Sequence, residues 1–210
     1  MIQIKSVSVG TLGTNCYVVT DKYSGETAVV DPGGVNARLM TILKEIGEEN
    51  IKYILLTHGH FDHTAGVNAI LEDFSPQVVI CEKEEPFLSD VNLNLADILG
   101  CMSFEPIYAD ITLCEGDSLY LGETEFKLME TPGHTTGSAC FIFPEDRVIF
   151  SGDTLFYQSM GRTDFPTGSH LDMMKSLKRL KNLSGDYKVY PGHNESTTLE
   201  YERISNLYMS

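Results

Sequence analysis

The sequence has few basic residues: 15 Lys and Arg stand against 30 Asp and Glu in 210 residues, which gives a formal net charge of −15. A surface of that sign repels phosphate backbones, so we expect no nucleic acid among the partners. No stretch approaches the ~18–20 apolar residues of a membrane span, and the first residues lack the apolar core of a signal peptide. We therefore expect a soluble, cytoplasmic protein with no membrane partner.

Cys-x-x-Cys pairs are also absent, and the five cysteines are odd in number and scattered along the chain. Most of them lie within apolar runs, as Cys81 and Cys140 do. This pattern predicts reduced, buried thiols. A catalytic cysteine is the less favoured alternative, because a small buried hydrophobe is the usual role of a free cysteine.

No linker or low-complexity segment interrupts the chain, so we expect one domain over residues 1–210. Its pattern of apolar runs and turn residues predicts strands at 2–9, 16–20, 26–30, 52–57, 77–81, 111–113, 118–121, 125–130, 138–143, 147–150 and 187–190. Helices are predicted over 36–46, 64–73, 82–89, 169–182 and 196–208, and a loop with some helix over 90–110. Strands at both hairpin and crossover spacing favour an α+β fold with a mixed sheet, or two sheets, covered by helices.

Three imidazoles and a carboxylate lie within six residues, directly after an apolar strand, in the run His58-Gly59-His60-Phe61-Asp62-His63. These side chains are preferred ligands of zinc and similar divalent metals. His58 and His60 are two residues apart, so on extended backbone both rings project to the same side and can share one metal. Asp62 and His63 lie where a helix is predicted to begin, which suits a second metal beside the first.

Other ligand-type residues follow the ends of later strands, namely His134, Asp153 and His193. His134 could complete the first site and His193 the second, and Asp153 could bridge the two because a carboxylate has two oxygens. Each residue alone also fits a structural role, as a hydrogen-bonded histidine, a cap or a turn residue. The combination favours metal binding. His170 has no strand-end context and is predicted to be a surface residue.

These motifs together resemble those of the metallo-β-lactamase superfamily, in the same order along the chain. The resemblance extends from Asn15-Cys16-Tyr17 through Thr131–Thr135 and Ser151–Phe156 to Pro191-Gly192-His193. Within the superfamily the chain is most similar to short, single-domain glyoxalase II-like (hydroxyacylglutathione hydrolase-like) hydrolases. The resemblance implies an αβ/βα four-layer sandwich with its metals at one edge.

Carried over by position, the resemblance implies two divalent metal ions, with zinc as the first expectation and iron or manganese as alternatives. One ion would be held by His58, His60 and His134 and the other by Asp62, His63 and His193, with Asp153 bridging them. Asp31 would orient the histidine loop from behind. Asp62 distinguishes the chain from the true β-lactamases, which vary this motif.

The activity that the resemblance implies is hydrolysis of a small-molecule thioester, such as a hydroxyacylglutathione, by a hydroxide that bridges the two ions. Asp62 would orient this nucleophile and accept its proton. A homodimer is compatible with the sequence.

Two features depart from the glutathione-specific members of the family. We expect no C-terminal helical glutathione-binding domain, and their Gly-His-Glu-Tyr motif reads Gly192-His193-Asn194-Glu195 here, without the tyrosine. Arg162 aligns with the loop that contacts glutathione. It could hold a substrate carboxylate, or it could form an internal ion pair with Asp164.

Two other functions stay open. The stretch Gly161–Phe165 also resembles persulfide dioxygenases, which bind a single iron through the first-site histidines and the residue matching Asp153. Hydrolysis is favoured because the full ligand set and the ending at 191–199 look like the compact hydrolases. A non-catalytic, metal-binding interaction module is the alternative of another class, and the seven intact ligands argue against it.

Overall fold

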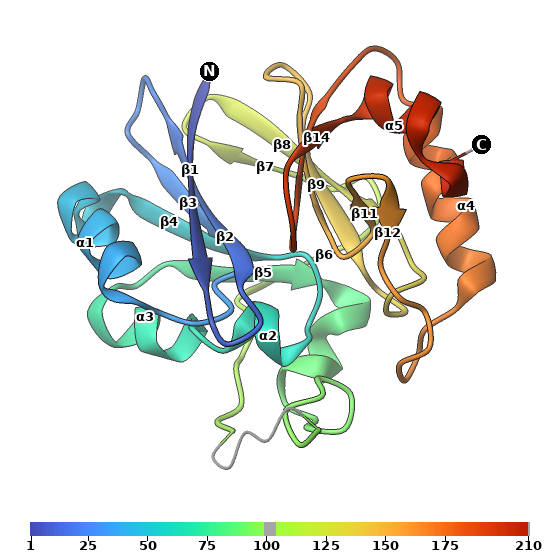
Figure 1. The fold of residues 1–210 in the computed structure, drawn as a ribbon. Coiled ribbons are helices and arrows are strands. Elements are labelled where there is room, and N and C mark those ends of the chain that lie inside the picture. The colour runs from blue at the N-terminus through green and yellow to red at the C-terminus, as the bar shows by residue number, and fades with distance from the viewer. Residues whose placement is uncertain (99–103, 210) are drawn as a thin grey trace.

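The computed structural model describes residues 1–98 and 104–209, and this part of the chain contains two six-stranded sheets (Figure 1). The strands of the first sheet follow sequence order: β1 (Ile2–Val9), β2 (Thr14–Asp21), β3 (Thr27–Val30), β4 (Ile51–Leu56), β5 (Gln77–Cys81) and β6 (Ile111–Leu113). β1 to β3 pair antiparallel, whereas β3 to β6 pair in parallel. The first sheet is therefore mixed.

The second sheet has the order β14-β13-β10-β9-β8-β7. Its strands are β7 (Ser118–Leu121), β8 (Thr124–Glu130), β9 (Ala139–Phe143), β10 (Val148–Gly152), β13 (Lys188–Pro191) and β14 (Thr197–Thr198). Only β10 and β13 pair in parallel among these neighbours. A separate two-stranded hairpin, β11 (Leu155–Phe156) and β12 (Ser159–Met160), follows β10.

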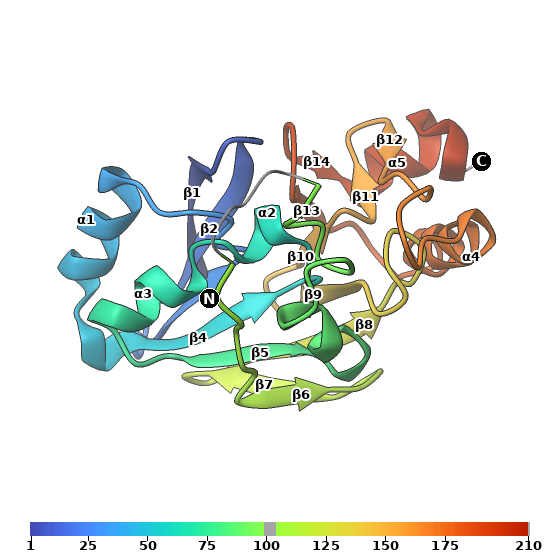
Figure 2. The same ribbon diagram turned by 90° about the horizontal axis from the view of Figure 1, so that it is seen from below.

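Helices cover the outer faces of both sheets (Figures 1 and 2). The first sheet packs against α1 (Ala37–Ile46) and α3 (Val67–Asp73), and the second against α4 (His170–Lys181) and α5 (Leu199–Ser205). Four short elements complete the description: α2 (Phe61–Thr64) and the 3₁₀ helices η1 (Glu48–Asn50), η2 (Glu82–Leu88) and η3 (Leu207–Met209). The layer order helix, sheet, sheet, helix is the αβ/βα sandwich that was expected.

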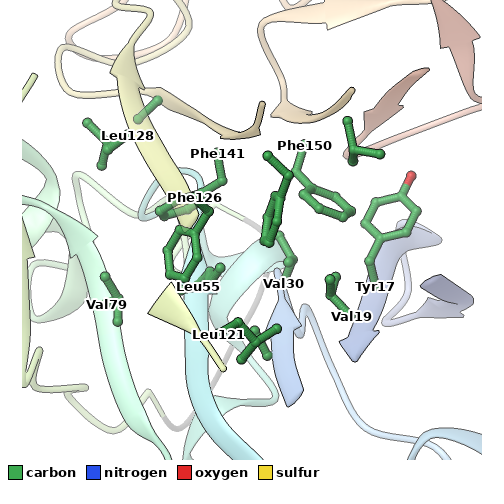
Figure 3. Packing of buried hydrophobic residues seen from close by; sticks show 14 of the residues in the cluster. Tyr17, Val19, Val30, Leu55, Val79, Leu121, Phe126, Leu128, Phe141 and Phe150 are labelled. Atoms are coloured by element: carbon green, nitrogen blue, oxygen red, sulfur yellow. The ribbon is translucent and has the colours of Figure 1, made fainter. Parts of the chain in front are cut away.

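Aromatic and branched side chains fill the space between the two sheets (Figure 3). The first sheet contributes residues such as Val30 and Leu55, and the second contributes Phe126, Phe141 and Phe150. All five residues of β9 and all five of β10 are buried, because one face of each strand meets this core and the other meets α4.

Helix boundaries follow local signals in the chain. α1 begins where the Asn36 side chain accepts the Leu39 N–H at 2.9 Å, and it ends at Gly47, which adopts a φ of 87°. α4 begins at Ser169, whose hydroxyl accepts the Asp172 N–H. Both caps lie within one residue of the predicted helix starts.

The single helix predicted over 64–73 is instead α2 and α3, separated at Gly66. The Gly66 N–H donates to the Pro32 carbonyl at 2.7 Å, and a Cβ at Gly66 would lie 2.7 Å from that same oxygen. The chain breaks here to pack against a distant loop, which the local periodicity does not encode.

The final helix predicted over 196–208 is also divided, into β14, α5 and η3. Thr197 pairs with Val189 at the sheet edge, and the Thr198 hydroxyl then caps α5 by accepting the Tyr201 N–H. The helix predicted at 82–89 is the 3₁₀ helix η2, which contains Pro86. A proline removes a backbone N–H and so disfavours a continuous α-helix.

The loop with some helix predicted over 90–110 lies partly outside the described residues, because 99–103 are not described. Residues 90–98 and 104–110 form turns and loop without helix.

Three of the four described cysteines are buried, so the predicted burial is confirmed for Cys16, Cys81 and Cys140. Cys114 is exposed, contrary to that prediction, and Cys101 lies outside the described residues. Within the described part, no helix combines the length and apolar character that a membrane-spanning segment needs.

We expect Phe126→Ala to destabilise the protein by about 3–5 kcal/mol, because it removes a fully buried ring from between the sheets. That ring stacks on Phe143 with centroids 5.2 Å apart. Urea unfolding measures the change. Leu171→Ala, at a 67% exposed position of α4, is the control and should shift stability by less than about 0.5 kcal/mol. Equal shifts for the two variants would contradict the described core.

Candidate metal centre

Loops from both sheets meet at the carboxyl ends of β4, β8, β10 and β13, and these loops carry all seven predicted ligands. The two sheets are joined there by backbone hydrogen bonds. The Ala139 N–H donates to the Thr57 carbonyl at 2.9 Å, and the Asn15 N–H donates to the Gly192 carbonyl at 2.7 Å. The strand ends therefore converge as the sequence predicted.

The first group of ligand-type atoms consists of ring nitrogens from His58, His60 and His134. His60 Nδ1 lies 3.1 Å from His58 Nε2 and 2.9 Å from His134 Nε2. All three side chains are buried. Three nitrogens that face one another this closely form a cradle for a single cation.

The second group consists of Asp62, His63 and His193. Asp62 Oδ2 lies 3.2 Å from His193 Nε2 and 3.7 Å from His63 Nε2. Asp62 and His63 come from α2, whereas His193 follows β13. The helix start predicted for Asp62 and His63 is thus present. The two groups adjoin, because the ring centroids of His58 and His63 lie 4.1 Å apart.

Asp153 lies between the two groups. Its Oδ1 is 3.4 Å from His63 Nε2, and its Oδ2 is 3.6 Å from His134 Nε2 and 3.7 Å from His193 Nε2. One carboxylate therefore faces histidines of both groups, which is the placement a bridging ligand requires.

Hydrogen bonds on the outer side of the rings fix which nitrogen faces the centre. His134 Nδ1 donates to the Arg162 carbonyl at 2.8 Å, and His63 Nδ1 donates to Asp31 Oδ2 at 3.1 Å. His58 Nδ1 lies 3.2 Å from the Thr57 hydroxyl, which itself donates to Asp31. In its neutral form, each of these rings then presents an Nε2 lone pair to the centre.

Asp31 is the residue behind the histidine loop, in the place predicted for it. It is buried, and it accepts the Thr57 N–H at 2.8 Å and the Thr57 hydroxyl at 2.7 Å in addition to His63. Its backbone adopts a φ of 48°, which is uncommon for a residue other than glycine. The three hydrogen bonds offset this local strain.

Gly192 allows the backbone to approach the cluster closely. A Cβ at Gly192 would lie 2.5 Å from both Asp153 Oδ1 and His63 Cε1. Any side chain at this position would push apart the groups that the cluster brings together. This explains the glycine before His193 in steric terms.

The residues present fit a divalent cation. His63 Nε2 and Asp153 Oδ1 are buried, lie 3.4 Å apart and have no hydrogen-bond partner. Because His63 donates from its other nitrogen, two lone pairs would oppose each other here, and only a proton or a cation between them relieves that repulsion. The donor set of imidazoles and carboxylates suits zinc, iron or manganese.

Burial lowers the proton affinity of two rings of the first group, His58 and His60. Burial, reinforced by neighbouring imidazoles, holds the pKa of His58 well below the usual 6.5. Burial and then the His134 ring lower the pKa of His60 to about 3. Both rings are therefore neutral, and ready to bind a metal, throughout the neutral pH range.

The second group has the opposite tendency. Burial alone would lower the pKa of His63, but the Asp62, Asp153 and Asp31 carboxylates raise it well above its usual range. Burial is likewise outweighed at His193, where Asp62 and Asp153 raise the pKa. Without a metal, these rings hold their protons more tightly than an ordinary histidine does.

A cavity of about 550 Å³ opens directly onto the cluster. Five of the predicted ligands line it together with an apolar wall made of Leu12, Leu95, Phe156, Met160 and Phe165. Arg162 also lines this cavity, but its Nε and Nη2 atoms donate to the two Asp164 oxygens at 2.7 Å each. Of the two roles predicted for Arg162, the structure contains the ion pair with Asp164.

His170 is exposed at the start of α4, as predicted.

Sequence reasoning missed one residue that contacts the histidine loop. Glu84 in η2 is fully buried and accepts the Gly59 N–H at 2.8 Å, between His58 and His60. Its neighbours Glu82 and Glu85 are exposed. Nothing in this acidic run distinguishes the buried glutamate from the exposed ones.

Comparison with known proteins identifies the family. A family model of the metallo-beta-lactamase superfamily matches residues 9–193. The chain therefore belongs to this superfamily, and its mixed α/β sandwich is the metallo-β-lactamase fold.

Similar proteins carry different names. The chain is 31% identical to hydroxyacylglutathione hydrolase GloC of Haemophilus influenzae, over 100% of this chain and 99% of that protein. The crystal structure of the BLEG-1 B3 metallo-β-lactamase is 35% identical, with a TM-score of 0.87 and coverage of 99% of this chain and 100% of that chain. TTHA1623, solved in a di-iron-bound form, is 32% identical, with a TM-score of 0.84 and coverage of 97% and 99%. The comparisons thus identify a metallo-hydrolase superfamily and leave the substrate open.

The opposite pKa shifts predict that the two groups lose metal at different pH. Where a raised pKa keeps His63 and His193 protonated, a metal must displace protons, so second-group affinity falls by about tenfold per pH unit for each proton displaced. The first group, with neutral His58 and His60, changes little. Zinc titration against a chelator at about pH 8 and about pH 6 measures this. Parallel weakening of both sites on acidification would refute the prediction.

Proposed function

We propose that this protein is a metal-dependent hydrolase with a dinuclear centre. The observation that carries the proposal is the position of Asp153, whose two oxygens face histidines of both groups. The assigned ligands are His58, His60 and His134 for the first ion, Asp62, His63 and His193 for the second, and Asp153 for both.

Two divalent ions held there would supply a water that ionises near neutral pH and a Lewis acid for the substrate carbonyl. Asp62 lines the cavity, and although burial raises its pKa, the His63 imidazole and the hydrogen bond from His193 lower it overall. The carboxylate is therefore ionised and able to accept a proton. We assign Asp62 the roles of orienting the water and accepting its proton.

The substrate that we propose is a small-molecule thioester. Hydrolysis joins the water oxygen to the carbonyl carbon and breaks the C–S bond, which releases a carboxylic acid and a thiol. The printed function of GloC, a hydroxyacylglutathione hydrolase, supports this class. The apolar wall of the cavity would hold the acyl chain or the thiol carrier beside the metals and exclude water from the reacting bond.

Zinc is the first metal to test, since the donor set is typical of it. The di-iron form of TTHA1623 makes iron the second. Manganese accepts the same nitrogen and oxygen ligands.

A mononuclear iron persulfide dioxygenase is the second candidate function, favoured by the Gly161–Phe165 stretch, which lies beside the cavity through Arg162 and Phe165. Elemental analysis separates the two: one iron per chain together with oxygen uptake on a persulfide would replace hydrolysis as the proposed function. The similarity to BLEG-1, a B3 metallo-β-lactamase, speaks against using Asp62 to exclude β-lactamases, so a β-lactam is a further substrate class to assay.

Asp153→Asn is expected to lower kcat/KM for thioester hydrolysis by more than about 100-fold and to reduce the metal content of both groups, because the amide nitrogen cannot act as a bridging oxygen. Elemental analysis and an assay on S-lactoylglutathione measure the two effects. His170→Ala, which changes an exposed histidine outside the cluster, is the matched control and should keep both metals and full activity. An Asp153→Asn enzyme with two metals and full activity would sink the proposal.

The Arg162–Asp164 pair should determine how strongly KM depends on a carboxylate in the substrate. Among the described residues that line the cavity, Arg162 is the only Lys or Arg, and Asp164 occupies its donors. Asp164→Asn should therefore lower KM for a carboxylate-bearing thioester by about 2–10-fold, since an exposed ion pair is worth about 0–1 kcal/mol and a freed arginine pairs with a carboxylate. KM for an uncharged thioester should not change. A lower KM for both substrates, or for neither, would remove Arg162 from substrate recognition.

A further inference from the structure

A buried carboxylate joins the loops that carry the first histidine group. Glu84 Oε2 accepts the Gly59 N–H at 2.8 Å, and Glu84 Oε1 accepts the Gly137 N–H at 2.8 Å. The Thr135 side chain also hydrogen-bonds this carboxylate. Gly59 separates His58 from His60, and Gly137 follows His134 by three residues.

The fit around this carboxylate is tight on both sides. A Cβ at Gly59 would lie 2.3 Å from Phe87 Cβ, and a Cβ at Gly137 would lie 2.9 Å from Glu84 Oε1. Both loops therefore pack directly on η2, without side chains between. A small movement of Glu84 would be transmitted to both loops.

The chemistry of this position requires a carboxylate. Two backbone N–H groups point at Glu84 from different loops, so two acceptor oxygens are needed. A glutamine of the same length offers only one oxygen, and its NH₂ would face the other N–H donor. Burying a carboxylate without a cationic partner is costly, and burial raises the pKa of Glu84 to about 7. Within the described residues no Lys, Arg or His forms an ion pair with Glu84 that would offset this cost.

We propose that Glu84 is a positioning residue that sets the distance between the His58–His60 loop and the His134 loop, and thereby the metal affinity of the first group. The two loops come from different sheets, β4 in one and β8 in the other. Glu84 would act through Gly59 and Gly137 and would not touch metal or substrate. This inference rests on the proposed metal centre.

The test measures zinc binding to metal-free protein in two backgrounds. In His193→Ala, which removes a ligand of the second group, the tighter zinc binding reports on the intact first group; in His134→Ala it reports on the intact second group. We expect Glu84→Gln to weaken zinc binding by about 10–100-fold in the His193→Ala background, the range typical of residues that orient ligands. In the His134→Ala background it should leave zinc binding unchanged. Glu85→Gln, an exposed glutamate of the same 3₁₀ helix, is the matched control and should change neither.

Three outcomes overturn the inference. Unchanged zinc affinity for Glu84→Gln in the His193→Ala background would show that Glu84 does not position the first group. Equal weakening in both backgrounds, or loss of the folded metal-free protein on circular dichroism, would show that Glu84 supports the fold in general. If the unmutated protein binds no zinc, iron or manganese, the proposed metal centre itself fails. If the unmutated protein binds two ions and Glu84→Gln leaves zinc affinity unchanged, only the role of Glu84 fails.

Discussion

The cluster depends above all on Asp31, a buried carboxylate that holds the histidine loop against the end of the first sheet. It accepts hydrogen bonds from the Thr57 backbone, the Thr57 hydroxyl and His63. Through Thr57 the same restraint reaches His58. One carboxylate therefore orients a ring from each histidine group, and these charge-assisted bonds offset both its desolvation and its left-handed backbone.

Glu84 is the counterpart of Asp31 on the other side of the loop. Asp31 fixes the rings through their outer nitrogens, and Glu84 fixes the backbone between two of them. The two buried acids are paired with backbone and side-chain donors, whereas Asp153 and His63 keep buried atoms without partners. This contrast distinguishes residues that build the site from residues that face a ligand. The fold satisfies the hydrogen bonds of Asp31 and Glu84 and leaves atoms of Asp153 and His63 for a cation. The unpartnered atoms lower the stability of the metal-free protein, and metal binding would offset that loss.

Much of this arrangement follows from short-range patterns in the sequence. His134, Asp153 and His193 each follow an apolar run within a few residues, so the end of a buried strand predicts their place. His170, which lacks such a run, is exposed. Most strands were also predicted to within two residues, because apolar runs bounded by turn residues leave a clear signal. The β11–β12 hairpin was not, since strands of two residues have no periodicity.

What the sequence could not show depends on contacts between distant residues. Glu84 and Glu85 are adjacent acids in one run, and only packing against Gly137 decides which is buried. The break at Gly66 likewise depends on the hydrogen bond from its N–H to the distant Pro32 carbonyl. Tertiary contacts therefore decide which glutamate is buried and where the helix breaks, and local sequence patterns do not encode them.

The most direct test of the account is anomalous diffraction from crystals of the zinc-loaded protein. The account predicts two peaks about 3.5–4 Å apart, with nitrogen and oxygen atoms of the seven assigned residues at about 2.0–2.2 Å from them and Asp153 between both. Peaks located elsewhere, or none at the cluster while His58, His63 and His134 turn their Nε2 atoms away from one another, would contradict it.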